Sequence, residues 1–121
     1  MDLLRTIRVL TDPGRIRILR LLLNEELNVA ELQEILGVGQ STLSMQLSQL
    51  KQADLVELRR QGTKSIYSAS LPPDAESLVL QIIASAESEI PEISADDSAM
   101  AMVLSRRQDQ LRSYFDELAG K

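Results

Sequence analysis

The sequence predicts a mainly α-helical fold with one small β-hairpin. Apolar residues recur at helical spacing over most of the 121 residues, and only residues 55–70 alternate polar and apolar residues around a glycine. Of all residues, 44% are hydrophobic but only three are aromatic: Tyr67, Tyr114 and Phe115. The core must therefore be aliphatic, as is typical of helical packing. We expect one domain at residues 1–89, a linker at 90–98 and an amphipathic C-terminal helix at 99–121.

Two helices are expected at the start of the chain. The first covers residues 2–10 and has an apolar side formed by Leu3, Leu4, Ile7 and Leu10. The second covers residues 13–23, where Asp12 can cap the exposed N–H groups and Pro13 suits a first position that needs no N–H. Because this second helix is apolar over most of its circumference, we place it at the centre of a small bundle.

A third helix is expected after Asn28. Glu31 follows three residues later, which resembles a capping box with asparagine in place of serine or threonine. The apolar stripe of this helix consists of Val29, Leu32, Ile35 and Leu36. The segment Gly37-Val38-Gly39 then ends the helix, because glycine adopts the left-handed conformation that redirects a chain into a next helix.

The fourth helix, residues 40–53, is the most informative for function. It has a narrow apolar stripe of Leu43, Leu47 and Leu50, and it carries no charge before Lys51. Its other faces carry Gln40, Ser41, Thr42, Ser44, Met45, Gln46, Ser48 and Gln49. Hydroxyls and amides can bond base edges and phosphates, whereas carboxylates would be repelled. This pattern is typical of a helix that enters the major groove of double-stranded DNA, although an ordinary polar helix face is the alternative.

A β-hairpin follows this helix directly. Residues 55–60 and 65–70 alternate, and a glycine-containing turn joins them. Three cations, Arg59, Arg60 and Lys64, lie at or near its tip. Such cations can simply protect an edge strand from aggregation, but after a DNA-reading helix they are expected to grip phosphates. Helix, turn, helix and hairpin in this order predict a winged helix-turn-helix.

A late helix is expected at residues 74–89. Apolar sides of this helix and of the first helix are more than a winged core of about 70 residues can cover, which predicts a homodimer through the first and late helices. The expected interface residues are Leu3, Leu4, Ile7, Leu78, Val79, Ile82 and Ile83.

The net charge of −5 is unevenly distributed. Residues 1–70 have nine Lys or Arg against eight Asp or Glu, whereas residues 71–121 have four against ten. The first part can therefore present a local basic surface, and binding to DNA is expected to depend on a compact patch and on salt.

Several classes of function are disfavoured by what the chain lacks. Without any Cys or His it has no disulfide, thiolate, imidazole base or Cys/His zinc site. No nucleophile–base pair and no phosphate loop occur, and we therefore expect that the chain is not an enzyme. Ser41, which has no base beside it, is expected to be a helix cap or a phosphate ligand. No membrane-spanning run or signal peptide is seen, which predicts a cytoplasmic protein with no membrane partner and no cofactor.

Three segments resemble the ArsR/SmtB family of winged-helix regulators. These are Leu10-Thr11-Asp12-Pro13-Gly14-Arg15-Ile16-Arg17-Ile18-Leu19, close to the family pattern "LsDPtRlrIL"; residues 27–32 with 40–51; and residues 53–56 running into Arg59-Arg60-Gln61-Gly62 and Tyr67. The resemblance covers about the first 70 residues. It implies a dimer clasped by its first and late helices, a recognition helix, a wing and an inducer that releases DNA.

The chain departs from this family at two places. Metal-sensing members have Cys where this chain has Asn28 and Ala30, and their late helix supplies Asp and His. Because this chain has neither Cys nor His, we reject sensing of soft metals and expect no metal site. Many members have Arg-His where this chain has Met45-Gln46. Losing a cation lowers nonspecific affinity, whereas Gln46 could pair with adenine and Met45 could touch a thymine methyl.

The resemblance leaves more than one function open. A repressor that binds an inverted-repeat operator is the first, with an unidentified small-molecule effector. A winged-helix module that binds proteins and has lost DNA binding is the second. Ser105-Arg106-Arg107 followed by Tyr114-Phe115-Asp116-Glu117-Leu118-Ala119 resembles the junction at which some members continue into an S-adenosylmethionine-dependent methyltransferase. The third is therefore the regulatory domain of a methyltransferase-linked regulator, while an amphipathic helix that packs on the dimer also explains this segment.

Overall fold

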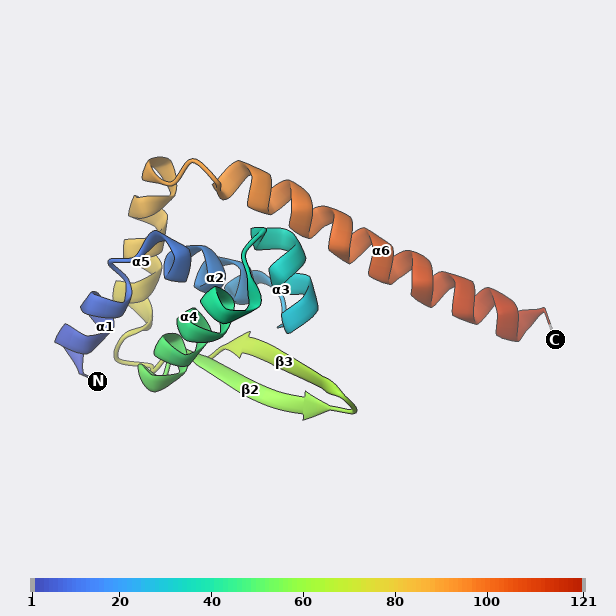
Figure 1. Cartoon of the computed structure of the whole chain (residues 1–121), viewed down its shortest axis with the longest axis horizontal. Coiled ribbons are helices and arrows are strands. Elements are labelled where there is room, and N and C mark those ends of the chain that lie inside the picture. The colour runs from blue at the N-terminus through green and yellow to red at the C-terminus, as the bar shows by residue number, and fades with distance from the viewer. Residues whose placement is uncertain (1, 121) are drawn as a thin grey trace.

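A computed structural model describes residues 2–120 and contains helices packed beside a small antiparallel sheet (Figure 1). The elements in chain order are α1 (Leu3–Val9), α2 (Pro13–Asn24), β1 (Leu27–Asn28), α3 (Val29–Leu36), α4 (Gln40–Gln52), β2 (Val56–Gln61), β3 (Lys64–Ala69), α5 (Glu76–Ala86), the 3₁₀ turn η1 (Glu87–Glu89) and α6 (Ile93–Ala119). Helices α1 and α5 lie at one end, and α6 projects from the other (Figure 1). No helix among these residues is long and apolar enough to cross a membrane.

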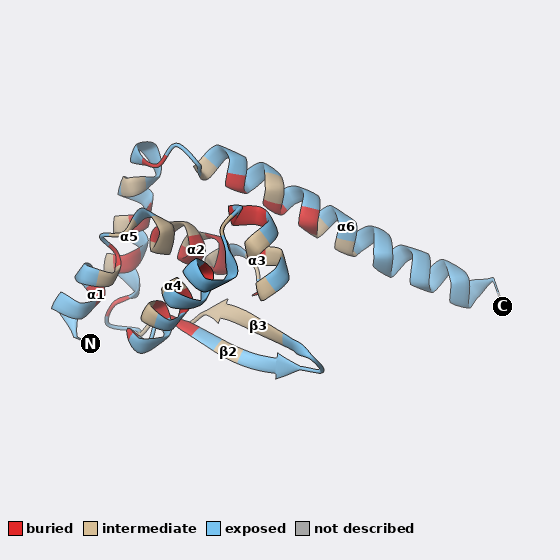
Figure 2. Cartoon of the chain, viewed as in Figure 1, coloured by how far each residue is buried: buried red, intermediate tan, exposed pale blue. Residues whose placement is uncertain are grey.

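The predicted helix boundaries are confirmed to within two residues for the first four helices. Asp12 caps α2 by accepting hydrogen bonds from the backbone N–H groups of Gly14 (2.7 Å) and Arg15 (3.4 Å). Asn28 and Glu31 form the expected capping box at the start of α3. The buried residues of α2 form the centre of an aliphatic core, which also includes Leu32 of α3 and Leu43 of α4 (Figure 2).

The sheet has three strands in the order β1-β3-β2, one more than the sequence predicts. Gln61 pairs with Lys64 across a two-residue turn, in which Gly62 has a φ of +63° that favours glycine. Strand β1 consists of only two residues, and Leu27 pairs with Tyr67 of β3. A two-residue strand has no periodicity to detect, so that only the tertiary pairing reveals it.

The segment expected as a linker is different in the structure. Only residues 90–92 are non-helical, and the helix α6 begins at Ile93 instead of residue 99. Asp96, in the first turns of this helix, is 2% exposed and accepts hydrogen bonds from the Nε and Nη2 atoms of Arg17, both at 2.8 Å. In the sequence, the two aspartates of this segment suggested an exposed loop. In the structure, Asp96 instead joins α6 to α2 through its hydrogen bonds with Arg17.

Two residues of the expected dimer interface are not available to a partner. Val79 is 0% exposed and Ile83 is 4% exposed, because both pack into the core of the single chain. The prediction was wrong for these two residues, since helical spacing alone does not tell which neighbour covers an apolar side. Leu78 and Ile82 are half-buried, and Leu3, Leu4 and Ile7 of α1 are exposed as expected.

Candidate nucleic-acid interface

Helix α4 is fixed to the body by one side and exposed on the others. Gly37 ends α3 with a φ of +65°, a left-handed conformation that lets the chain turn into α4. Leu43, Leu47 and Leu50 are at most 2% exposed, and the helix contacts α2 and β2. The stripe predicted from spacing is therefore the buried side, and the remaining faces point away from the core.

The outer face of α4 is uncharged, as predicted. Before the exposed Lys51 in its last turn, the exposed residues of the helix are Gln40, Ser41, Thr42, Ser44, Met45 and Ser48. Met45 is the one large apolar side chain among them and is 54% exposed. Gly39 provides no side-chain cap for the helix, so that the first N–H groups of α4 stay open toward solvent. Such N–H groups attract anions, phosphates included.

Gln46 and Gln49 are half-buried and bond within the chain. The guanidinium of Arg15 donates from Nη1 to the Oε1 atom of Gln46 (2.9 Å) and to that of Gln49. Arg15 also donates from Nε to the backbone carbonyl of Val9 at 2.6 Å. Gln46 in turn donates from Nε2 to Oδ1 of Asp12 at 3.2 Å. Both amide oxygens thus face α2, although the sequence led us to expect both side chains at the DNA surface.

Gly14 explains how α2 and α4 come so close at this point. A Cβ atom built on Gly14 would lie 2.9 Å from Nε2 of Gln46 and 3.0 Å from Oδ1 of Asp12. These distances are shorter than van der Waals contact, so that any larger residue must displace the Gln46 amide. The chain has glycine where the family pattern has threonine, and the smaller residue leaves room for the Gln46 amide at this position.

The three wing cations differ in their surroundings. Arg60 is exposed, and it forms no ion pair with any described residue. Lys64 is also exposed and forms no ion pair with a described residue, although its charge contributes to lowering the pKa of Glu31. Arg59 instead forms an ion pair with Glu26 and a 3.4 Å hydrogen bond with Gln61. Arg60 and Lys64 are therefore better placed than Arg59 to meet phosphates.

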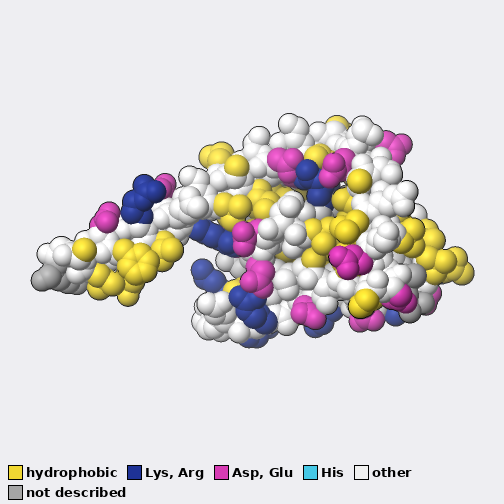
Figure 3. Space-filling view, turned by 180° about the vertical axis from the view of Figure 1, so that it is seen from behind, with side chains coloured by type: hydrophobic (Ala, Val, Ile, Leu, Met, Phe, Trp, Pro, Cys, Tyr) yellow, Lys and Arg dark blue, Asp and Glu magenta, His cyan; other side chains and the backbone are white. Residues whose placement is uncertain are grey.

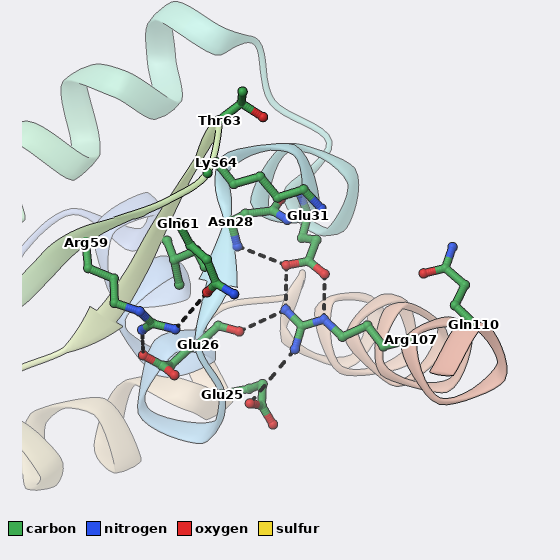
Figure 4. A pocket seen from close by; sticks show the side chains of 12 residues that line it. Glu25, Glu26, Asn28, Glu31, Arg59, Gln61, Thr63, Lys64, Arg107 and Gln110 are labelled. Atoms are coloured by element: carbon green, nitrogen blue, oxygen red, sulfur yellow. Dashed lines mark hydrogen bonds and ion pairs between the residues drawn. The ribbon is translucent and has the colours of Figure 1, made fainter. Parts of the chain in front are cut away.

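A hollow of about 590 Å³ lies between the wing, α3 and α6 (Figure 4). On its floor, Arg107 of α6 donates to both carboxylate oxygens of Glu31, at 2.6 and 2.5 Å. Burial alone would raise the pKa of Glu31, but the hydrogen bonds from Arg107 and from the Asn28 backbone outweigh it and lower that pKa. Because Glu31 also closes the capping box, α6 is connected to the start of α3.

The comparisons with known proteins agree with this architecture. Residues 12–57 match the family described as "Bacterial regulatory protein, arsR family". The crystal structure of Rv0081 from Mycobacterium tuberculosis is 35% identical and covers 84% of this chain and 87% of that chain, with a TM-score of 0.56. The chain belongs to the arsR family. In sequence alone, Rv0081, an uncharacterized HTH-type transcriptional regulator, is 42% identical over 74 residues.

Two further structures share the winged helix-turn-helix fold. The transcriptional repressor BigR from Xylella fastidiosa is 31% identical over 67% of this chain and 79% of its own, with a TM-score of 0.59. A homodimeric winged helix-turn-helix DNA-binding domain, Mb0332 from Mycobacterium bovis, is 31% identical over 70% of this chain and 80% of its own, with a TM-score of 0.60. By sequence, the matching segment spans 65% of the length of Rv0081.

This arsR-family chain uses the metal-ligand positions of its relatives differently. Asn28 stands at one position where metal-sensing members have Cys, and its side chain caps α3 by accepting from the Glu31 N–H at 2.8 Å. Ala30, at the other, is exposed. Within residues 2–120, no three Asp or Glu side chains gather closely enough to hold a metal ion.

Sequence analysis missed the residues that hold the interface in place. Nothing near Arg15 in the sequence predicts its contacts with Gln46 and Gln49, although an arginine in the first turn of a helix, close to the positive end of the helix dipole, is unusual. Glu26, which pairs with Arg59, follows another glutamate and looks like an ordinary surface charge. Their partners lie more than 30 residues away in the chain, so that only the folded structure identifies them.

Proposed function

We propose that the chain binds double-stranded DNA as a homodimer and represses transcription from an inverted-repeat operator. The observation that carries this proposal is the uncharged outer face of α4 beside the exposed wing cations Arg60 and Lys64. Family membership supports it, and so do the names of relatives that are repressors. Two-fold symmetry would place the two α4 helices about 34 Å apart, one turn of DNA.

Within this proposal, the residues of α4 have two roles. Ser41, Thr42 and Met45 are exposed near the start of the helix and are proposed to meet phosphates and base edges, with Gln40, Ser44 and Ser48 beside them. Gln46 and Gln49 are proposed to position the helix, because Arg15 already occupies their amide oxygens. A glutamine needs a free oxygen and a free N–H to pair with adenine, so that the Gln46–adenine pairing expected from the sequence requires release from Arg15.

A gel shift with the promoter DNA of its own gene tests the proposal. We expect a complex that prefers this DNA over a shuffled sequence and weakens as salt increases. Met45→Ala is expected to change the preference among operator variants, whereas Arg60→Ala should weaken binding to every sequence alike. Absence of any salt-sensitive, sequence-selective complex would refute DNA binding as the function.

A second candidate is a protein-binding module, with or without a linked methyltransferase. The exposed apolar side chains on the outer half of α6 favour it, because such a surface is unusual on a monomer. Copurification of a stoichiometric partner protein, together with absent DNA affinity, would support this alternative over the repressor.

A further inference from the structure

Lys64, the first residue of the wing strand β3, borders two hollows. One is the hollow of about 590 Å³ described above, which it lines together with Glu31 and Arg107. The other has a volume of about 420 Å³, and Lys64 lines it together with Gln40, the first residue of α4. Because a lysine has a long and flexible stem, its ammonium group can turn toward either side. The same cation can therefore serve the α6 side or the side of the DNA-reading helix.

Glu31 is the carboxylate for which two cations compete. In Figure 4, Lys64 points toward it from the wing, and Arg107 points toward it from α6. The Glu31 side chain is 13% exposed, so that water screens its charge only in part. Arg107 donates to both of its carboxylate oxygens, whereas Lys64 forms no ion pair with it and only helps to lower its pKa. Arg107 thus occupies the place at Glu31 that is open to Lys64 from the other side.

We propose that Arg107 keeps Lys64 available to DNA by occupying the carboxylate of Glu31. Without Arg107, this carboxylate would keep the hydrogen bond from the Asn28 backbone N–H, at 2.9 Å, and Lys64 would be the remaining cation that acts on it. The lysine would then turn into the hollow, and the wing would lose a cation that binds phosphate. This inference rests on the proposed binding of DNA. It makes Arg107, a residue of α6, a positioning residue for the wing.

The neighbouring charges act in the same direction. Figure 3 shows Lys or Arg side chains beside Asp or Glu side chains where the projecting helix leaves the body. Arg107 also donates to the backbone carbonyl of Glu26 at 3.0 Å and lies 3.9 Å from a carboxylate oxygen of Glu25. Its removal would leave the carboxylates of the hollow in excess over the cations. Of the two remaining cations that line the hollow, Arg59 is already ion-paired, so that the excess would act on Lys64.

The next residue of α6, Arg106, provides a matched comparison. It donates to the two carboxylate oxygens of Glu34 at 3.1 and 2.8 Å, so that it also links α6 to α3. Glu34 is not among the residues that line the hollow, and the charges that shift its pKa are those of Arg106 and Glu31. Removing Arg106 therefore breaks an ion pair between the same two helices without leaving a carboxylate in front of the wing.

Fluorescence anisotropy with the promoter DNA of its own gene, at several salt concentrations, measures the effect on binding. We expect Arg107→Ala in the full chain to weaken binding about fivefold for a dimer, which corresponds to one weak ion pair in each protomer. The slope of log K against log salt concentration should become shallower by up to about 2, because each protomer loses one phosphate contact. Arg106→Ala should leave the affinity within about twofold of the wild type and the slope unchanged.

Glu31→Gln separates this electrostatic role from a merely structural one. Glutamine can still close the capping box, but it removes the charge that would attract Lys64. We expect Glu31→Gln to bind DNA at least as tightly as the wild type, and the double variant with Arg107→Ala to regain the affinity and the salt slope of the wild type. If Arg107 acted only by anchoring α6, Glu31→Gln would weaken binding as Arg107→Ala does, and the double variant would not recover. Either of these results overturns the proposal.

The competition at Glu31 can also be measured in the free protein, without DNA. The NMR signal of its carboxyl carbon, followed against pH, reports the pKa of Glu31. Because Lys64 lowers this pKa, Lys64→Ala should raise it slightly in the wild type and clearly more in the Arg107→Ala background, where the lysine contacts the carboxylate. Equal increases in the two backgrounds would mean that Lys64 does not move to Glu31, and the proposal would be wrong.

The outcomes separate this inference from the proposed function. A wild-type chain that binds its promoter selectively, while Arg107→Ala binds as tightly as Arg106→Ala, overturns the role of Arg107 and leaves repression intact. A wild-type chain that shows no selective DNA binding overturns repression. If the effect of Lys64→Ala on Glu31 nevertheless grows when Arg107 is removed, the competition of the two cations for Glu31 is supported without the proposed function.

Discussion

Replacing Asp96 by asparagine is expected to destabilise the chain by about 3 kcal/mol. The carboxylate is 2% exposed and the side chain of Arg17 is 15% exposed, so that the pair is shielded from water. Removing one partner of a buried pair costs about 3–5 kcal/mol, because the remaining charge is left without compensation. We expect the lower end of this range, since Arg17 keeps the Leu36 carbonyl at 3.3 Å and Glu92 at 3.9 Å.

Urea unfolding followed by far-UV circular dichroism measures this loss, because most of the signal comes from helices. Asp97→Asn is the matched control: Asp97 pairs with Arg20 in the same turn of α6 but is 52% exposed, and its loss should cost less than about 1 kcal/mol. Both variants are measured at two protein concentrations, because dimerisation would add to the apparent stability. If Asp96→Asn costs less than about 1 kcal/mol, or no more than the control, burial does not govern the strength of this pair.

Three further perturbations follow from the interface. Arg60→Ala should lower DNA affinity for all sequences alike and reduce the slope of log K against log salt concentration by about 1 per contacted phosphate. Fluorescence anisotropy at several salt concentrations measures both effects. An altered base preference with an unchanged salt slope would contradict the phosphate role. Gly14→Ala should displace the Gln46 amide and weaken binding to the operator without unfolding the chain, and an unchanged Gln46 side-chain amide NMR shift would contradict the close contact. Hydrogen bonds from Arg107 and from the Asn28 backbone lower the pKa of Glu31 in the folded chain, so that the stability from this pairing is present above the ordinary glutamate pKa and is lost as the pH falls through the lowered pKa. Protection factors of the α6 amides, which correct for the intrinsic pH dependence of exchange, should therefore fall in acid, and Glu31→Gln should lower them already at neutral pH.

The sequence predicted those features of the fold that depend on local chemistry. The capping residues Asp12 and Asn28, the break at Gly37 and the buried stripe of α4 each follow from a few neighbouring residues, and the structure confirms all of them. The start of α6 was missed because Asp96 looks polar in isolation and is buried only through its pairing with Arg17. Strand β1 was missed for the same reason, since it exists only through its pairing with β3.

The candidate site was predictable in outline but not in its contacts. The uncharged face of α4 and the wing cations could be located from spacing, because a helix and a hairpin fix which residues point outward. Which of these side chains are already engaged depends on residues from distant segments. Arg15 holds Gln46 and Gln49, and Glu26 pairs with Arg59, through contacts between residues 31 to 34 positions apart.

The salt dependence of DNA binding gives a quantitative test of this distribution of charge. Nine Lys or Arg precede residue 71, but four of them are ion-paired with acidic side chains: Arg15, Arg17, Arg20 and Arg59. Three exposed cations near α4 and the wing, Lys51, Arg60 and Lys64, form no ion pair within the described chain. A dimer would then contact about six phosphates through them, which predicts a slope of about −5 for log K against log salt concentration. If all nine contributed, the slope would be about −16. Arg5 and Arg8 are also free of ion pairs in the described chain, and with them a dimer would reach a slope of about −9. A measured slope clearly steeper than about −9 would mean that DNA displaces internal ion pairs, and the division into structural and DNA-binding cations would then be wrong.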